Sequence, residues 1–245
     1  MTGARNIEVL KTPDLVAEKA AAIIALEARR AVAERGRFVM AVSGGHTPWL
    51  MLRILAIAEV PWPAVHIVQV DERVAPAESP DRNFAHLRKD LLQYVPLAAG
   101  QIHEMPVETT DLATGAMRYA RTLQRIAGTP PVLDLVHLGL GPDGHTASLV
   151  PGDPVLDIAN ADVAVTQTYQ GRRRMTLTYP MINRSRRILW VITGTEKSRM
   201  LLRLLDGDES IPAGRVRRER VLLIVDEAAA AKLSAEQKTA TQQCV

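Results

Sequence analysis

A short apolar run that ends in a glycine-rich loop constrains this chain more than any other feature. Residues 133–138 read LDLVHL, a pattern typical of a buried β-strand that leads into a turn. The loop that follows, residues 139–150, contains three glycines and two titratable side chains, Asp143 and His145. Because glycine lets the backbone turn sharply and approach a ligand, the sequence predicts a strand tip that presents an acid and an imidazole as a candidate site.

Patterns typical of strands and helices alternate along the rest of the chain. Helical patterns separate most of the strand patterns, which occupy residues 7–10, 38–42, 65–70, 163–166, 175–178, 187–193 and 221–225. This alternation predicts an α/β fold with a mostly parallel sheet and helices on both faces. No internal repeat is present, so we expect a single domain over residues 1–233, followed by a polar, disordered tail at 234–245.

The turn after the second of these strands is a candidate phosphate site. It contains Ser43, Gly44 and Gly45, and then Thr47 and Pro48, a typical helix start with Thr47 as N-cap. Free amides and the positive end of the helix dipole favour an anion there, and glycine removes the side-chain atoms that would hold the anion away. The alternative is a capped turn without a ligand.

Charged residues accompany three other predicted segments. Asp71 and Arg73 come directly after the third strand, at a tip that a parallel sheet would place at its ligand-binding edge. Lys197 lies in the first turn of a predicted helix, where a cation is unfavourable unless an anion binds. Within the loop run of arginines at 172–174, we take Arg174 as the candidate ligand contact. Solvated charge clusters are the alternative interpretation.

Two other enzyme classes share parts of these patterns. The glycines of the loop 139–150 spell G-x-G-x-x-G, which is the dinucleotide fingerprint, but Asp143 would bring a negative charge to the pyrophosphate and Pro151 would limit the helix. The sequence around Ser43 is one residue short of the serine-hydrolase elbow. A triad in the usual order would end on His145 and leave one hundred residues beyond it.

The composition excludes several classes of protein. A hydrophobic content of 47% supports a real core, and a formal charge of +3 with few aromatic residues argues against nucleic-acid binding. The only cysteine, Cys244, permits neither an internal disulfide nor a cysteine-based metal site, so we expect no metal and a reducing compartment. No apolar run approaches the ~20 residues of a membrane span and no signal peptide is recognisable, so we expect a cytoplasmic protein without membrane contact.

Five motifs follow one another along the chain: SGGHTP, DERVAP, GLGPDGHTASLVPG, RMTLTYPMINRSRRILWVITGTEKS and VDEAAA. Together they resemble the motifs of the 6-phosphogluconolactonase family, over nearly the whole length and in the same order. The resemblance implies a Rossmann-like α/β fold. It also implies hydrolysis of 6-phospho-D-glucono-1,5-lactone to 6-phosphogluconate in the pentose phosphate pathway, without an obligatory cofactor.

The resemblance further implies roles for individual residues. They are Ser43, Gly44, Gly45 and Thr47 on the phosphate-side loop, Asp71 and Arg73 on an acidic-arginine motif, His145 as the catalytic histidine, and Lys197 after the late strand. The chain departs from the family pattern at His46, His137 and Val150, where serine, an apolar residue and phenylalanine are common. None of these departures removes a chemically necessary group.

The expected reaction is attack of water on the carbonyl of a small sugar-phosphate lactone. His145 takes the proton of the water, and either Asp71 or Asp143 orients the imidazole, without a metal or a covalent nucleophile. We expect the chain to act as a monomer or a weak homo-oligomer. One alternative is a glucosamine-6-phosphate deaminase, whose pattern carries a glutamate five residues after the histidine, where this chain has Val150. Another is a non-catalytic sugar-phosphate-binding protein.

Overall fold

A parallel sheet of seven strands forms the centre of the molecule. The computed structural model describes residues 6–239, and in this part of the chain the main sheet has the order β1-β10-β9-β6-β2-β3-β5. Every neighbouring pair is parallel. The strands are β1 (Asn6–Leu10), β2 (Phe38–Val42), β3 (Val65–Gln69), β5 (Ile102–His103), β6 (Leu135–Leu138), β9 (Arg187–Ile192) and β10 (Val221–Asp226). The predicted α/β class with a mostly parallel sheet is confirmed.

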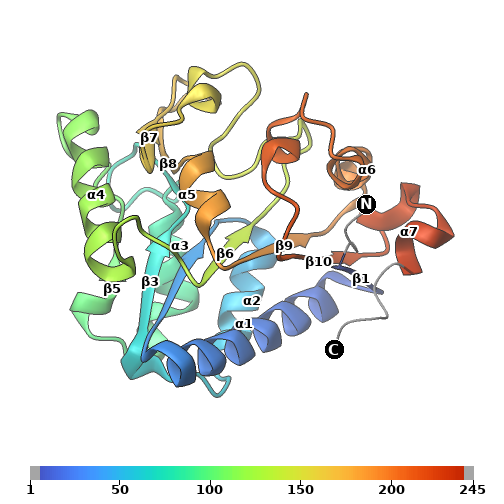
Figure 1. Cartoon of the computed structure of the whole chain (residues 1–245), viewed down its shortest axis with the longest axis horizontal. Helices are drawn as coiled ribbons and strands as arrows, with labels where there is room; N and C mark the ends of the chain where they lie inside the picture. The colour runs from blue at the N-terminus through green and yellow to red at the C-terminus, as the bar shows by residue number, and fades with distance from the viewer. Residues whose placement is uncertain (1–5, 240–245) are drawn as a thin grey trace.

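Helices cover both faces of this sheet, as the alternating pattern predicted, with α1 below the strands in Figure 1 and α5 and α6 above them. Those that pack in one hydrophobic cluster are α1 (Pro13–Arg35), α2 (His46–Ala56) and α3 (Asn83–Asp90), and those in the other are α4 (Leu112–Ala127), α5 (Tyr179–Arg184) and α6 (Ser198–Asp206). Side chains of β2 alternate between the clusters: Phe38 and Met40 join the first, whereas Val39 and Ala41 join the second. None of the described helices is long and apolar enough to span a membrane.

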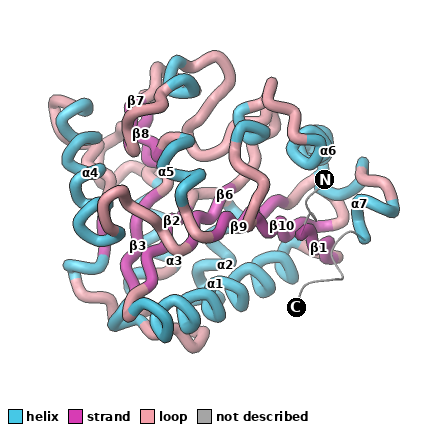
Figure 2. Tube along the Cα trace, viewed as in Figure 1, coloured by secondary structure: helices cyan, strands magenta, loops and turns pink. Residues whose placement is uncertain are grey.

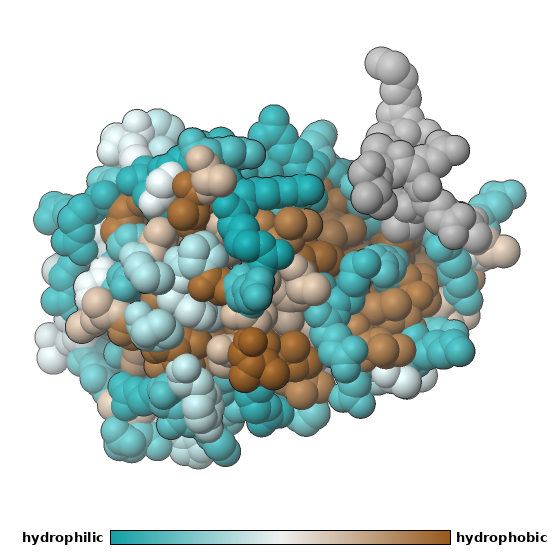
Figure 3. Space-filling view, turned by 90° about the horizontal axis from the view of Figure 1, so that it is seen from below, coloured by the Kyte–Doolittle hydropathy of each residue, from teal (hydrophilic) through white to brown (hydrophobic). Residues whose placement is uncertain are grey.

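Local sequence signals set the limits of α1. The Thr12 hydroxyl accepts a hydrogen bond from the Leu15 amide at 3.3 Å, and Pro13 is the first helical residue. Gly36 ends the helix in the left-handed region, with φ 74°, and its amide donates to the Val32 carbonyl at 2.8 Å. The buried side is rich in alanine, so the helix can lie close to the sheet. Seen from below, this face of the molecule shows apolar residues between hydrophilic ones (Figure 3).

A second sheet of three antiparallel strands was not predicted from the sequence. Its order is β4-β8-β7, and Figure 2 shows β7 and β8 set apart from the central strands. The strands are β4 (Asp71–Arg73), β7 (Val163–Val165) and β8 (Arg174–Leu177). Val70 joins the two sheets, because its amide donates to the Val42 carbonyl at 2.9 Å and its carbonyl accepts from the Leu177 amide at 2.8 Å. The second sheet escaped prediction because β4 pairs with a strand far along the chain.

The segment expected to be a disordered tail contains a short helix, α7 (Ala235–Thr239). The Ser234 hydroxyl accepts from the Gln237 amide at 3.2 Å, and the Gln237 side chain accepts from the Ser234 amide at 3.0 Å. This reciprocal pair is a capping box, a helix signal hidden within a polar composition. Residues 235–239 of the segment expected to be disordered thus form a helix, and residues 240–245, with Cys244, lie outside the described part of the chain.

The strand order creates a crevice at the centre of the sheet. From β2 the chain moves outward through β3 and β5, then returns to β6 on the other side of β2 and continues through β9 and β10. The order therefore reverses between β2 and β6. Open α/β sheets bind ligands at such a switch point, outside the carboxyl ends of the strands.

Glu72 anchors the second sheet to α3 from a fully buried position. Its carboxylate accepts hydrogen bonds from the amides of Asn83 and Phe84 at the start of α3, each at 2.8 Å, and from Gln69 Nε2 at 2.8 Å. The buried guanidinium of Arg82 lies 3.2 Å from the same carboxylate. The negative charge of Glu72 therefore compensates both the free amides of a helix start and a buried cation.

Replacing Glu72 by glutamine is expected to destabilise the fold by about 1 to 3 kcal/mol, because the buried hydrogen bonds to Glu72 lose their charged acceptor while Arg82 keeps Glu104 and Glu108 as ion-pair partners. Urea unfolding followed by circular dichroism measures this difference. Glu78→Gln, at an exposed position of the same segment, is the control and should change the free energy of unfolding by less than about 0.5 kcal/mol. Equal stability of the two variants would contradict the anchoring role.

Candidate active site

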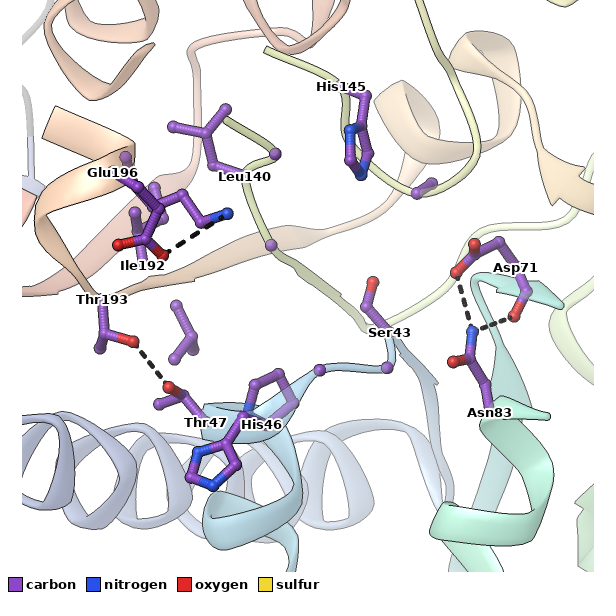
Figure 4. Close-up of a pocket in the computed structure, with 18 of the residues that line it drawn as sticks. Ser43, His46, Thr47, Asp71, Asn83, Leu140, His145, Ile192, Thr193 and Glu196 are labelled. Carbon is purple, nitrogen blue, oxygen red and sulfur yellow. Dashed lines mark hydrogen bonds and ion pairs between the residues drawn. The ribbon is translucent and has the colours of Figure 1, made fainter. Parts of the chain in front are cut away.

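The carboxyl ends of the central strands border a cavity of about 370 Å³ (Figure 4). Its walls come from the turn after β2, the loop after β6, the segment after β9 and residues of the antiparallel sheet. The candidates from the sequence that line it are Ser43, Gly44, Gly45, Thr47, Asp71, Arg73, His145, Arg174 and Lys197. The remaining candidate, Asp143, is hydrogen bonded to His145. The fold therefore brings all the predicted site residues together.

His145 and Asp143 form the acid–imidazole pair of this cavity. Asp143 Oδ1 lies 2.6 Å from His145 Nδ1 and accepts the His145 amide at 3.1 Å. Burial alone would raise the pKa of Asp143, but the charge of His145 and the hydrogen bonds to this carboxylate outweigh burial and lower the pKa. An ionised Asp143 keeps the imidazole proton on Nδ1, so Nε2 is the nitrogen that can accept another proton. Of the two carboxylates considered from the sequence, Asp143 is the one placed to orient His145.

Gly141 provides the space in which the imidazole lies. Its amide donates to the His145 carbonyl at 2.8 Å, which closes a tight loop. A Cβ atom at position 141 would lie 2.1 Å from His145 Nδ1 and 2.7 Å from Asp143 Oδ1, so no side chain fits there. Residues 141–150 form turns, and the G-x-G-x-x-G spacing therefore lacks the helix N-terminus that a pyrophosphate needs. The glycine pattern accommodates an imidazole and does not support a dinucleotide site.

Asp71 lies on the wall formed by the antiparallel sheet (Figure 4). Its Oδ2 accepts the Ser148 hydroxyl at 2.5 Å, and its Oδ1 accepts Asn83 Nδ2 at 3.4 Å. Burial raises the pKa of Asp71, although the Ser148 hydrogen bond and two nearby arginines oppose this effect. The hydrogen bonds of Asp71 go to Ser148 and Asn83 and not to His145. Within residues 6–239, no group of three or more histidine, cysteine, aspartate or glutamate side chains is placed to hold a metal ion.

The turn after β2 is fixed to β6 by Ser43. The Ser43 hydroxyl donates to the His137 carbonyl at 2.9 Å, and the Ser43 amide donates to His137 Nδ1 at 3.2 Å. Burial lowers the pKa of His137 to about 4, so its imidazole stays neutral and can accept this hydrogen bond. Because the Ser43 hydroxyl is bonded to a backbone carbonyl and not to an imidazole base, the geometry does not support the serine-hydrolase alternative.

Helix α2 begins two residues earlier than predicted, at His46. Gly45 takes the N-cap position with φ 130°, a conformation open mainly to glycine. The predicted N-cap, Thr47, therefore lies in the first turn, and its Oγ1 lies 2.6 Å from Thr193 Oγ1 at the end of β9 (Figure 4). The first amides of α2 still have no intrahelical acceptor, so the predicted anion site keeps its donors.

Two of the predicted cations reach the cavity from opposite segments. Lys197 ends the short turn before α6, and its Nζ lies 3.8 Å from the Glu196 carboxylate. Arg73 Nη1 donates to the Asp81 carbonyl at 2.8 Å and to Asn83 Oδ1 at 3.1 Å, which holds the guanidinium on the cavity wall. Both cations line the cavity that the start of α2 also borders.

The structure separates the members of the arginine run at 172–174. Arg172 forms an exposed ion pair with Asp81, and Arg173 donates to the Thr166 carbonyl. Arg174, which was expected in a loop, is the first residue of β8 and lines the cavity. Arg174 is therefore the member of the run that is placed to contact a ligand in the cavity.

Three residues of the site were not predicted as such: Asn83, Ser148 and Tyr169. Asn83 Nδ2 donates to the Asp71 carbonyl at 3.1 Å, and a Cβ at Gly44 would lie 2.1 Å from Asn83 Oδ1, so this glycine makes room for the amide. The Tyr169 hydroxyl donates to Asp143 Oδ2 at 2.8 Å. The sequence around Asn83 indicates only a helix start. Ser148 and Tyr169 contact the site through Asp71 and Asp143, which lie far from them in the sequence.

Comparison with known proteins identifies the family of this chain. The model of the family described as glucosamine-6-phosphate isomerases/6-phosphogluconolactonase matches residues 11–224. The chain belongs to this family. A 6-phosphogluconolactonase of Synechocystis sp. is 35% identical over 202 residues, which cover 81% of this chain and 84% of the relative. The 6-phosphogluconolactonase of Mycobacterium tuberculosis is 34% identical over 242 residues, which cover 93% of this chain and 98% of the relative.

Solved structures share the fold. The 6-phosphogluconolactonase from Trypanosoma cruzi has a TM-score of 0.85 at 25% identity, and the match covers 96% of this chain and 99% of that one. A monomeric glucosamine-6-phosphate deaminase has a TM-score of 0.80 at 20% identity, with coverage of 92% and 99%, and this likeness concerns the fold alone. The single-domain, Rossmann-like α/β fold implied by the sequence motifs is therefore confirmed.

Lys197→Ala is expected to weaken the binding of inorganic phosphate by about tenfold or more, because a charge-assisted hydrogen bond is lost. Isothermal titration calorimetry at constant ionic strength measures the dissociation constant. Lys89→Ala, at an exposed position of α3, removes the same charge outside the cavity and should bind phosphate like the parent. An unchanged affinity in Lys197→Ala would remove this lysine from the anion site.

Proposed function

We propose that this chain hydrolyses 6-phospho-D-glucono-1,5-lactone to 6-phospho-D-gluconate, the second step of the oxidative pentose phosphate pathway. The observation that carries the proposal is that the oriented His145 and the free amides at the start of α2 line the same cavity. Hydrolysis of a phosphorylated lactone requires both a base that activates water and a group that holds the phosphate. The relatives at 34% and 35% identity are named 6-phosphogluconolactonase, which supports the assignment.

His145 acts as the general base. Its Nε2 takes a proton from water while the water oxygen attacks the carbonyl carbon of the lactone, and the carbonyl electron pair moves to the oxygen. When the tetrahedral intermediate collapses, the bond between this carbon and the ring oxygen breaks, and the proton on Nε2 passes to the ring oxygen. Asp143 stabilises the positive imidazole between the two steps. One water is consumed, and His145 returns to its starting state.

The other polar groups of the cavity contact different parts of the substrate. The amides of residues 44–47, together with Arg73 and Lys197, receive the phosphate, whereas the Ser43 amide is bonded to His137. The guanidinium of Arg174, which lines the cavity, donates to the carbonyl oxygen as that oxygen becomes negative. Asp71, held by Ser148 and Asn83, accepts a hydrogen bond from a sugar hydroxyl.

The proposed steps use groups of the protein and one water molecule. A δ-lactone carbonyl is already electrophilic, and its hydrolysis changes no oxidation state, so we assign no cofactor and no metal to the reaction. The substrate is a small soluble sugar phosphate, and the proposal includes neither nucleic acid nor membrane as a partner. We place the enzyme in the cytoplasm, as a monomer or a weak homo-oligomer.

The two alternatives fit the site less well. Val150 stands where the deaminase pattern carries a glutamate, and a side chain that is 3% exposed and cannot titrate offers no proton transfer for ring opening or amine loss. A non-catalytic binding protein would have no use for an ordered acid–imidazole pair. The 2.6 Å contact between Asp143 and His145 therefore favours catalysis.

The purified protein is expected to consume 6-phosphogluconolactone and to release no ammonia from glucosamine 6-phosphate, because position 150 supplies no carboxylate. Acid release followed with a pH indicator measures the first reaction, after subtraction of the spontaneous hydrolysis of the lactone. A coupled ammonia assay measures the second. Ammonia release at a rate comparable to lactone hydrolysis would overturn the assignment.

His145→Gln is expected to lower kcat by about 10²- to 10⁴-fold with little change in KM, because the general base is lost while the phosphate contacts remain. Steady-state kinetics at several pH values measure both constants, and circular dichroism checks the fold. His86→Gln, a histidine that stacks on Trp49 away from the cavity lining, should keep the parent kcat. If a folded His145→Gln variant retains more than about a tenth of kcat, the base is another group.

A further inference from the structure

Tyr169 binds the side of Asp143 that His145 leaves free. The two oxygens of the carboxylate are divided, because Oδ1 contacts His145 Nδ1 at 2.6 Å while Oδ2 accepts the Tyr169 hydroxyl at 2.8 Å. The Tyr169 ring also lies edge-on to the imidazole, with ring centroids 5.7 Å apart and an interplanar angle of 65°. Asp143 is thus held between a phenol and an imidazole.

A tight hairpin turn holds Tyr169 in this position. Its amide donates to the Arg172 carbonyl at 2.9 Å, and the Arg172 amide donates back to the Tyr169 carbonyl at 3.2 Å. Gln170 and Gly171 between them have φ values of 51° and 78°, the left-handed conformations that a type I′ turn requires. The exposed ion pair of Arg172 with Asp81 ties the hairpin to the segment after β4. The phenol therefore belongs to a hydrogen-bonded turn in the connection between β7 and β8.

Charged groups surround this phenol on the cavity side. The guanidinium carbon of Arg174 lies 5.0 Å from the centre of the Tyr169 ring, and Arg174 Nη2 donates to the Gln170 side chain at 3.2 Å. Asp71 and Arg73 on β4 are the next charges around Arg174. Burial first, and then the hydrogen bond and charge of Asp143, raise the pKa of Tyr169, so the phenol remains a donor through neutral pH.

We propose that Tyr169 is a positioning residue whose hydroxyl holds Asp143 and limits how strongly this carboxylate stabilises protonated His145. The inference rests on the proposed function, in which His145 must be neutral to accept a proton. A hydrogen bond to Oδ2 spreads the negative charge of Asp143 and makes the carboxylate a weaker acceptor at Oδ1. The protonated imidazole is then stabilised less than by a carboxylate without this bond, so we expect Tyr169 to keep the enzyme active over a wider range on the acid side.

The test is the pH dependence of kcat/KM for lactone hydrolysis in Tyr169→Phe, which removes the hydroxyl and keeps the ring. Asp143 then places its full charge on His145, so the acid limb of the profile should move to higher pH by roughly half a unit. kcat on the plateau should fall by about tenfold at most, and KM should stay unchanged. Tyr94→Phe, at a tyrosine that is 63% exposed, is the matched control.

A second variant moves the same limb the other way. Site-specific replacement of Tyr169 by 3-fluorotyrosine keeps the hydroxyl and makes the phenol a stronger donor, so the acid limb should shift to lower pH. In an Asp143→Asn background, Tyr169→Phe should no longer move the limb, because the charge that the phenol moderates is absent.

The outcomes separate this inference from the proposed function. If the parent does not hydrolyse the lactone, the proposed function fails. If the parent is active but the acid limb stays in place in Tyr169→Phe, or moves to lower pH, Tyr169 does not act through Asp143 and the inference is overturned. Should Tyr169→Phe fail to fold by circular dichroism, the fluorotyrosine variant decides, and an unmoved limb there contradicts the inference equally.

Discussion

Two backbone hydrogen bonds of Val70 fix the main sheet and the antiparallel sheet relative to each other, and both sheets contribute residues to the cavity. The N–H group belongs to the main sheet, and the carbonyl belongs to the antiparallel sheet. The next three residues form β4, in which Asp71 and Arg73 line the cavity while Glu72 between them is buried against α3. Because side chains alternate along β4, this short strand contributes residues both to the cavity and to the core. The backbone of Val70 thereby fixes the position of the cavity wall opposite the loop of His145.

Much of the fold and of the site could be predicted because the decisive signals are local. Gly36 ends a helix within one residue of an apolar strand, and the loop with Asp143 and His145 follows another strand directly. In a parallel sheet the carboxyl ends of the strands meet at one edge, so residues that directly follow different strands lie close together. This rule brought Ser43 and Lys197 to the same cavity although they are far apart in sequence.

The features that escaped prediction depend on contacts between distant segments or on subtle capping. The antiparallel sheet requires β4 to pair with β8. These strands have only three and four residues, and neither sequence indicates its pairing partner. Tyr169 acquires its contact with Asp143 only when a hairpin of that sheet folds over the β6 loop. The choice between Asp71 and Asp143 as partner of the imidazole was open for the same reason, because both carboxylates follow strand tips and only their three-dimensional placement separates them.

The absence of a side chain at position 141 has a consequence for how this loop can change. The imidazole occupies the volume that a Cβ atom would need there, whereas a Cβ at Gly139, two residues away, would meet nothing within 4 Å. Within three residues, the loop thus has one position that excludes any side chain, 141, and one position with space for a side chain, 139. A side chain at position 139 would extend into open space at the cavity lining, whereas a side chain at position 141 would displace both His145 and Asp143.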